Sequence, residues 1–288
     1  MPSIFDQIRQ ACAEVAELAD HVRIDQSAIE EYGEQLPVER LEEPERDEEI
    51  HYFGHGAETV AYVLTLDTVN FGSGYFPWTQ PRDGHTDYAM VARALTDRFD
   101  RHGPFSPEEL TELDMEACGE IFAQETQHDA RRKLMASFAH TLGELGEFLL
   151  EQYDGSYTAP VAEADGSAAR LLEILRQIPS FRDEVVYKNV DVPFYKRAQI
   201  TANDLHLAFD GESWGDFEDI DELTLFADNR VPHVLRMDGL LSYSDDLAEL
   251  VDNRQLIDPG AAEEIAIRAC AIHAVQVLSQ KTGVSARL

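Results

Sequence analysis

Residues 58–70, ETVAYVLTLDTVN, constrain the fold more than any other stretch, because apolar side chains lie on nearly every side of this segment. A helix that is apolar all round is buried inside a protein rather than exposed on its surface. We therefore expect a central helix here. Asp67 and Asn70 are three residues apart near its end and share one face. Buried polar groups need hydrogen-bonding partners, which the protein or a ligand must supply.

Helical spacing of apolar residues recurs along the chain, and strand signals are few. It predicts a short helix after Asp25 and helices over residues 3–20, 86–100, 108–125, 129–153, 166–178, 193–209, 221–229, 232–237 and 258–282. One short extended segment is expected over residues 184–192. The sequence therefore predicts an all-α fold. Because no linker-like stretch interrupts it, we expect a single domain over residues 1–288, with peripheral helices and an acidic loop (41–50) in residues 1–50.

The charge balance says more about the solvent than about partners. The net charge is −33, with 56 acidic and 23 basic residues. Dense carboxylates keep a protein hydrated in concentrated salt, which screens their mutual repulsion, so we expect a halophilic protein. This charge argues against a nucleic-acid partner, which requires a basic surface. The sequence shows neither a membrane-length apolar run nor a signal segment, and we expect a soluble, cytoplasmic protein with no membrane partner. Its oligomeric state is left open.

Metal and disulfide chemistry have little support in the sequence. The three cysteines are isolated and form neither a disulfide framework nor a CxxC pair. His51 and His55 are four residues apart, but Gly54 and Gly56 disfavour a helix and no third ligand is nearby. We interpret both histidines as loop or pocket residues, with metal binding as the minor alternative. We expect neither a metal nor a cofactor.

Asp228 differs from the other acidic residues because it lies within the apolar run LTLFADNRVP, residues 223–232. A carboxylate among large apolar side chains must be paired, hydrogen-bonded or shifted in pKa, since loss of water disfavours its charged form. Pro232 biases the residue before it away from the helical region, so Asp228 is expected at a helix end. It is either a structural partner of Arg230 or Arg197, or a catalytic carboxylate.

Lys196 is one of only four lysines, and it lies between the aromatic pair Phe194 and Tyr195 and the cation Arg197. Its position near the start of a predicted helix has two interpretations. The lysine either binds a ligand or extends its charged end from the helix into water. Phe71 belongs to a second aromatic-rich segment, residues 70–78, which either forms a pocket wall for a flat ring or packs on the core.

Six separated stretches, in the same order along the chain, suggest a family. They are LDTVNF (66–71), SFRD (180–183), FYKRAQI (194–200), LTLFADNRVP (223–232), GLLSYS (239–244) and EEIAIRA (263–269). Together they resemble the queuosine salvage proteins, the queuosine 5′-phosphate N-glycosylases. The resemblance covers most of the chain after residue 50. It implies a mostly helical fold with a likeness to helix-hairpin-helix DNA glycosylases.

The resemblance also implies an activity: hydrolysis of the N-glycosidic bond of a 7-deazaguanine nucleoside 5′-monophosphate, which releases queuine. Carried over residue by residue, it indicates Asp228 and Lys196 as catalytic residues. Asp228 would stabilise a cationic sugar and act on water, while Lys196 would hold the 5′-phosphate. The residues that we expect to bind the substrate are Asp67, Asn70, Phe71, Phe194, Tyr195, Arg197, Asp204, Arg230 and His55.

One segment departs from the family pattern. After Phe71 the resemblance predicts a short Phe-Trp-type sequence, but this chain has GSGYFPW over residues 72–78. If that loop lines the base pocket, the accepted base differs from queuine. Two alternative functions therefore stay open: a glycosylase acting on another modified nucleotide, and a helical protein that binds a nucleotide or base without catalysis.

Overall fold

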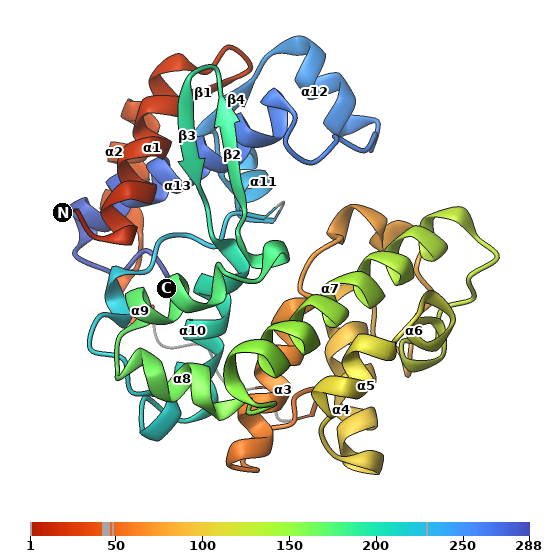
Figure 1. The fold of residues 1–288 in the computed structure, drawn as a ribbon. Coiled ribbons are helices and arrows are strands. Elements are labelled where there is room, and N and C mark those ends of the chain that lie inside the picture. The colour runs from red at the N-terminus through yellow and green to blue at the C-terminus, as the bar shows by residue number, and fades with distance from the viewer. Residues whose placement is uncertain (1, 42–46, 48, 229) are drawn as a thin grey trace. The chain divides into compact units, whose positions relative to one another are not determined.

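The computed structural model describes residues 2–41, 47, 49–228 and 230–288, and this part of the chain is mostly helical with four short strands (Figure 1). The mostly helical fold is therefore confirmed. Two compact units are present: unit 1 consists of Met1–Pro44, Asp183–Gln199 and Asp219–Leu288, and unit 2 of Glu45–Arg182 and Ile200–Glu218. A single domain over residues 1–288 stays a prediction. The predicted acidic loop at 41–50 lies mostly outside the described residues.

Unit 1 is built on the long helix α13 (Ala262–Thr282), against which α1 (Ile4–Leu18), α2 (Gln26–Gln35) and α11 (Arg230–Met237) pack (Figure 1). The apolar face of α1 is buried, as its helical spacing predicts. Gly283 ends α13 in the left-handed conformation, at φ +73°, which confirms the predicted end of this helix.

The strands of unit 1 form two antiparallel pairs. β1 (Val22–Ile24) pairs with β4 (Leu241–Tyr243), and β2 (Glu184–Tyr187) pairs with β3 (Val190–Pro193). The second pair is a hairpin, which confirms the extended segment expected over residues 184–192. The remaining elements of this unit are η1 (Val38–Arg40), η5 (Ile220–Glu222) and α12 (Asp245–Asp252).

Unit 2 contains the predicted central helix as α3 (Ala57–Thr68), in which the ten residues from Thr59 to Thr68 are all buried. The prediction from its apolar surroundings is therefore confirmed. Helix α7 (Asp129–Tyr153) packs on α3 and has the bounds predicted from its leucine stripe. The other elements of the unit are η2 (Ser73–Trp78), α4 (Asp87–His102), α5 (Pro107–Glu112), α6 (Met115–Ile121), α8 (Thr158–Ala164), α9 (Ala168–Leu175), η3 (Pro179–Phe181) and η4 (Ser213–Gly215).

The single helix predicted over residues 108–125 is wrong, because the chain forms α5 and α6 instead. Asp114 begins the second of these helices, where its side chain accepts the Ala117 N–H at 2.8 Å. An aspartate that binds backbone N–H groups in this way favours a helix start over a helix interior. Among the described helices, none is both long and apolar enough to cross a membrane.

The helix predicted over residues 193–209 is confirmed except for its start, whereas the helix predicted before Asp228 is wrong. Helix α10 is Lys196–Ala208 rather than 193–209, because Pro193 ends strand β3 and Tyr195 has a φ of +48°. The helix predicted over residues 221–229 is absent from the described residues there, since only η5 forms and the chain then runs without helix to Asp228. Buried Gln199 explains this, because its Oε1 accepts the Thr224 N–H at 2.8 Å. That N–H is consequently bonded to a side chain of α10 rather than to a carbonyl one helical turn earlier.

Candidate active site

Asp228 and Lys196 lie together in unit 1. Asp228 is half-buried at the start of α11, where its Oδ1 accepts the Arg230 N–H at 2.7 Å. Lys196 is the first residue of α10 and interacts electrostatically with Asp228. Burial lowers the pKa of Lys196, because it removes water from the ammonium group, and the negative charge of Asp228 opposes this effect. The two residues that the sequence indicates as catalytic are thus electrostatic partners.

Arg268 and Asp183 form an ion pair in unit 1. The Arg268 Nη1 and Nη2 atoms donate to Oδ1 and Oδ2 of Asp183 at 3.1 and 2.6 Å. Arg268 lies on α13, and its Nη1 also donates to Oε1 of Glu264 at 3.1 Å. Burial disfavours the guanidinium charge, but the two carboxylates outweigh burial and raise the pKa of Arg268. This arginine therefore stays charged although its side chain is only 11% exposed.

The Arg268–Asp183 ion pair also contacts the start of α10. The Oδ2 atom of Asp183 accepts the backbone N–H of Lys196 at 3.1 Å. Asp183 therefore performs the role of a helix cap, although it precedes the helix by thirteen residues and lies before strand β2. The charges of Asp228 and Asp183 raise the pKa of Lys196, while those of Arg268 and Arg197 lower it. Besides burial, which lowers it most, the pKa of Lys196 therefore responds to four charged groups of unit 1.

The aromatic pair before Lys196 is buried. Phe194 is 1% exposed, and the guanidinium carbon of Arg268 lies 3.9 Å from the centroid of its ring. One face of this predicted base-stacking ring is therefore covered by the arginine. Tyr195 is 3% exposed and donates its hydroxyl to Oε1 of Glu184 at 2.5 Å. Its positive φ is strained for a bulky residue, and this strain is typical of sites where the surrounding structure fixes the backbone.

The other two predicted cations are less buried. Arg197 is half-buried and follows Lys196 on α10, and its positive charge contributes to the lowered pKa of Lys196. Arg230 is exposed, and its backbone N–H is the group that Asp228 accepts. Unit 1 thus gathers Asp228 with several cations in a chain of net charge −33. Such a grouping has the charge to hold a phosphate.

Asp67 and Asp204 belong to a polar cluster within unit 2. Asp67 is fully buried on α3, and its Oδ1 accepts the Asn70 side-chain N–H at 3.3 Å. Asp204 lies in the part of α10 that belongs to unit 2. Burial raises the pKa of Tyr88 well above its usual value, and the charges of Asp204 and Asp67 add to this effect. Both carboxylates therefore act on one phenol, which stays protonated and can donate a hydrogen bond.

The two histidines of the HYFGH segment have different surroundings. The His51 Nε2 is 3.0 Å from the Tyr88 hydroxyl, and its Nδ1 is 2.8 Å from the Asp47 carbonyl. Burial lowers the pKa of His51. His55 is exposed, and its ring stacks on that of Tyr52 with the centroids 3.8 Å apart. His51 therefore joins the tyrosine side of the polar cluster, whereas His55 packs on a neighbouring ring.

Phe71 packs in unit 2 with its ring edge-to-face against Phe138, with the centroids 5.2 Å apart. Gly72 follows with a φ of +84°, and a Cβ at this position would lie 2.4 Å from Cδ1 of Leu134. Only glycine fits so close to α7. The GSGYFPW segment, which departs from the family pattern, forms η2. This helix packs against α4 and α7, and Trp78 at its end is 37% exposed.

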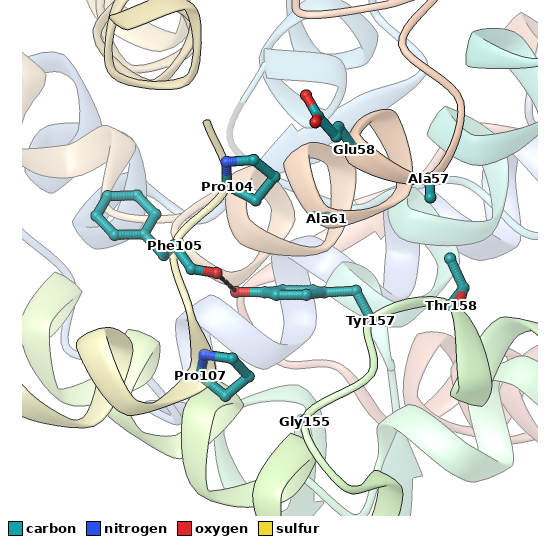
Figure 2. A pocket seen from close by; sticks show the side chains of 9 residues that line it. All are labelled: Ala57, Glu58, Ala61, Pro104, Phe105, Pro107, Gly155, Tyr157 and Thr158. Carbon is teal, nitrogen blue, oxygen red and sulfur yellow. Dashed lines mark hydrogen bonds between the residues drawn. The ribbon is translucent and has the colours of Figure 1, made fainter. Parts of the chain in front are cut away.

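A pocket of about 300 Å³ lies elsewhere in unit 2 (Figure 2). The Tyr157 hydroxyl lies at this pocket and donates to the Phe105 carbonyl at 3.1 Å (Figure 2). The lining residues are Ala57, Glu58, Ala61, Pro104, Phe105, Pro107, Gly155, Tyr157 and Thr158. None of the residues predicted to act on a substrate is among them.

Asp183, Arg268 and Tyr88 are site residues that were not predicted from the sequence. A signal for the first two was present, because they belong to the SFRD and EEIAIRA stretches on which the family resemblance depends. What the sequence could not indicate is their pairing, since 85 residues separate them. Tyr88 gave no signal, because an isolated tyrosine in a helix is most often part of the core.

Comparison with known proteins gives a consistent result. The family model described as "Queuosine salvage protein" matches residues 50–286. The chain is 35% identical to the queuosine 5′-phosphate N-glycosylase/hydrolase of Sphaerobacter thermophilus, over 92% of this chain and 82% of that protein. It is 30% identical to the protein of the same name from Dictyostelium discoideum, over 93% and 84%, and 28% identical to that of Mus musculus, over 95% and 84%.

Proposed function

This chain belongs to the queuosine salvage protein family, and from that membership we propose that it hydrolyses the N-glycosidic bond of queuosine 5′-monophosphate and releases queuine. The proposal makes the chain an N-glycosyl hydrolase whose substrate is a nucleotide. The observation that supports it most directly is that Arg268 contacts the backbone next to Asp228 and, through Asp183, the backbone N–H of Lys196. A carboxylate and an ammonium group are the two charges that this reaction requires.

Asp228 is proposed to act on the sugar. Cleavage of an N-glycosidic bond develops positive charge on the ribose, and a fixed carboxylate nearby stabilises that charge. The same carboxylate can orient or deprotonate the water molecule that attacks the anomeric carbon. Two hydrogen bonds hold the Asp228 segment: its Oδ1 accepts the Arg230 N–H, and the Ala227 carbonyl accepts the Arg268 Nε–H.

Lys196 is proposed to bind the 5′-phosphate of the substrate. Its ammonium group is a compact point charge, and Arg197 and Arg230 add guanidinium groups that bind phosphate in a bidentate manner. A partly buried lysine gains more from a bound anion than an exposed one, because less water screens the two charges. A bound phosphate also favours the charged form of this lysine, whose pKa burial lowers.

The departing base requires help of a different kind. A 7-deaza base lacks the N7 atom that acids protonate in ordinary purines, so hydrogen bonds to its other heteroatoms must stabilise it as it leaves. We propose that Asp67, Asn70 and Asp204 bind polar atoms of the base, as expected from the sequence. Their support is the polar cluster of unit 2, where Oδ1 of buried Asp67 accepts the Asn70 side-chain N–H and the charges of Asp67 and Asp204 act on Tyr88.

A direct assay tests the proposed function. The purified protein is incubated with queuosine 5′-monophosphate, and free queuine is measured by chromatography. Release of queuine with formation of ribose 5-phosphate supports the hydrolase. A binding protein without catalysis would retain the intact nucleotide, and a glycosylase for another base would release nothing from this substrate. Parallel incubation with other 7-deazaguanine nucleotides identifies the accepted base.

The proposal also includes the arrangement of the helices. We propose that the helices follow the plan of helix-hairpin-helix DNA glycosylases, in agreement with the mostly helical structure. Superposition of an experimental structure of the chain on such an enzyme tests this likeness. A helix order that could not be superposed would contradict it.

A further inference from the structure

We propose that Arg268 is a positioning residue of the active centre, which holds the Asp228 segment and the start of α10 in one fixed arrangement. This inference rests on the proposed function, because it concerns the residues that the proposed reaction uses. Arg268 is on α13, the helix on which unit 1 is built. Its guanidinium group contacts Ala227, Asp183 and Phe194. All of these residues belong to unit 1.

The first contact is with the segment that precedes Asp228. The Arg268 Nε donates to the carbonyl oxygen of Ala227 at 3.3 Å. Residues 223–228 form no helix, so their backbone groups lack the regular bonds of an α-helix. A guanidinium group bonded to the peptide that joins Ala227 to Asp228 fixes the backbone immediately before the proposed catalytic carboxylate.

The second contact passes through Asp183 to Lys196. Arg268 holds both oxygens of Asp183, and Oδ2 of the same carboxylate accepts the Lys196 N–H at 3.1 Å. The guanidinium group also lies 3.9 Å from the ring centroid of Phe194, two residues before Lys196. One arginine thus connects Ala227, Asp183 and Phe194, and through them the positions of both catalytic residues.

Arginine is the side chain that this arrangement requires. Its planar group donates several hydrogen bonds in fixed directions and stacks on an aromatic ring at the same time. Lysine keeps the charge but is a point donor without this planar geometry. Arg268→Lys should therefore retain an ion pair with Asp183 or Glu264 and lose the simultaneous bond to Ala227.

The experiment compares Arg268→Lys with Arg236→Lys. Arg236 is a matched control in unit 1, because it holds both oxygens of Asp252 at 2.9 and 3.2 Å and lies 4.8 Å from the Tyr243 ring centroid. Its partners are Asp252 and Tyr243 rather than Ala227 and Asp183. For each variant, kcat and KM for queuosine 5′-monophosphate and for the nucleoside are measured, together with the Tm.

Arg268→Lys is expected to lower kcat about 100-fold, the loss that a displacement of about 1 Å causes at a reacting centre. It should also reduce the preference for the monophosphate over the nucleoside, because Lys196 loses its fixed position. Arg236→Lys should keep kcat and that preference at wild-type values, with a similar Tm. If kcat and the preference are as high in Arg268→Lys as in Arg236→Lys, the positioning role is overturned.

Asp183→Asn is a second variant that tests the same positioning role if Arg268→Lys folds poorly. It should lower kcat as Arg268→Lys does, and the double variant should lose no more than the worse single variant, because the two residues act as one unit. Additive losses overturn the inference. A wild-type protein that releases no base overturns the proposed function and this inference with it, whereas an active wild type with an active Arg268→Lys overturns the inference alone.

Discussion

Asp228→Asn separates the charge of Asp228 from its structural role. Asparagine retains the Oδ1 atom that accepts the Arg230 N–H at 2.7 Å, so the start of α11 keeps its hydrogen bond. The substitution removes the negative charge from the site. It also removes the charge that raises the pKa of Lys196, so that pKa should fall further in the variant. The expected defect is therefore chemical rather than a loss of fold.

The size of the defect follows from the position of Asp228. The residue is half-buried, and an effective dielectric constant of about 20 applies to charges near a protein surface. A carboxylate about 4 Å from a full positive charge on the sugar then contributes about 4 kcal/mol. Because each 1.36 kcal/mol is a factor of ten in rate, kcat should fall by about 1,000-fold. The lost attraction between Asp228 and Lys196 costs about 1 kcal/mol of stability, or about 2–4 °C in Tm.

The assay measures queuine release by chromatography and nucleotide binding by calorimetry. Asp252→Asn is the matched control, because Asp252 pairs with Arg236 on α11 and should tolerate the change without loss of kcat. In Asp228→Asn, binding of the monophosphate should persist while turnover falls. Turnover at the wild-type rate by purified Asp228→Asn would refute the mechanism, and a Tm far below the control would mean that Asp228 is chiefly structural.

Three further predictions concern Lys196 and the surface charge. Lys196→Ala should raise KM for the monophosphate far more than for the nucleoside, and equal effects on both would exclude a phosphate role. The pKa of Lys196 is lowered from 10.5, so the lysine loses its proton at an alkaline pH below 10.5. KM for the monophosphate should therefore rise as the pH passes through this range. Lys196→Arg should abolish the rise, because arginine stays charged. A KM that is independent of pH in the wild type would contradict this. Raising the KCl concentration from about 0.1 M to about 1 M should raise the Tm. The Debye length shrinks from about 10 to about 3 Å, so the salt screens the repulsion within a chain of net charge −33. A lower Tm at high salt would contradict the halophilic interpretation.

Several predictions from the sequence depend on one local pattern and are confirmed. The apolar surroundings of residues 58–70 predict a buried helix, and α3 is buried along ten consecutive residues. The leucine stripe of residues 129–153 predicts α7 with its bounds. Helical periodicity is a property of a short segment, so it is readable without knowing what packs against that segment.

The predictions that fail near Lys196 and Asp228 depend on partners distant in the sequence. Residues 221–229 have the spacing of a helix, but Gln199 accepts the Thr224 N–H, and Arg268 donates to the Ala227 carbonyl. Local propensity cannot include such bonds, and tertiary contacts of this kind override it. The same limit applies to the start of α10, whose cap comes from Asp183.

The sequence by itself determined the helical class, the family, and the two residues, Asp228 and Lys196, on which the proposed chemistry depends. Only the tertiary structure decided that their charges interact and that Arg268 and Asp183 connect the segments that carry them. The physical reason is that spacing along the chain sets which face of a helix a side chain occupies. Hydrogen bonds between charged groups far apart in the sequence exist only after the chain has folded.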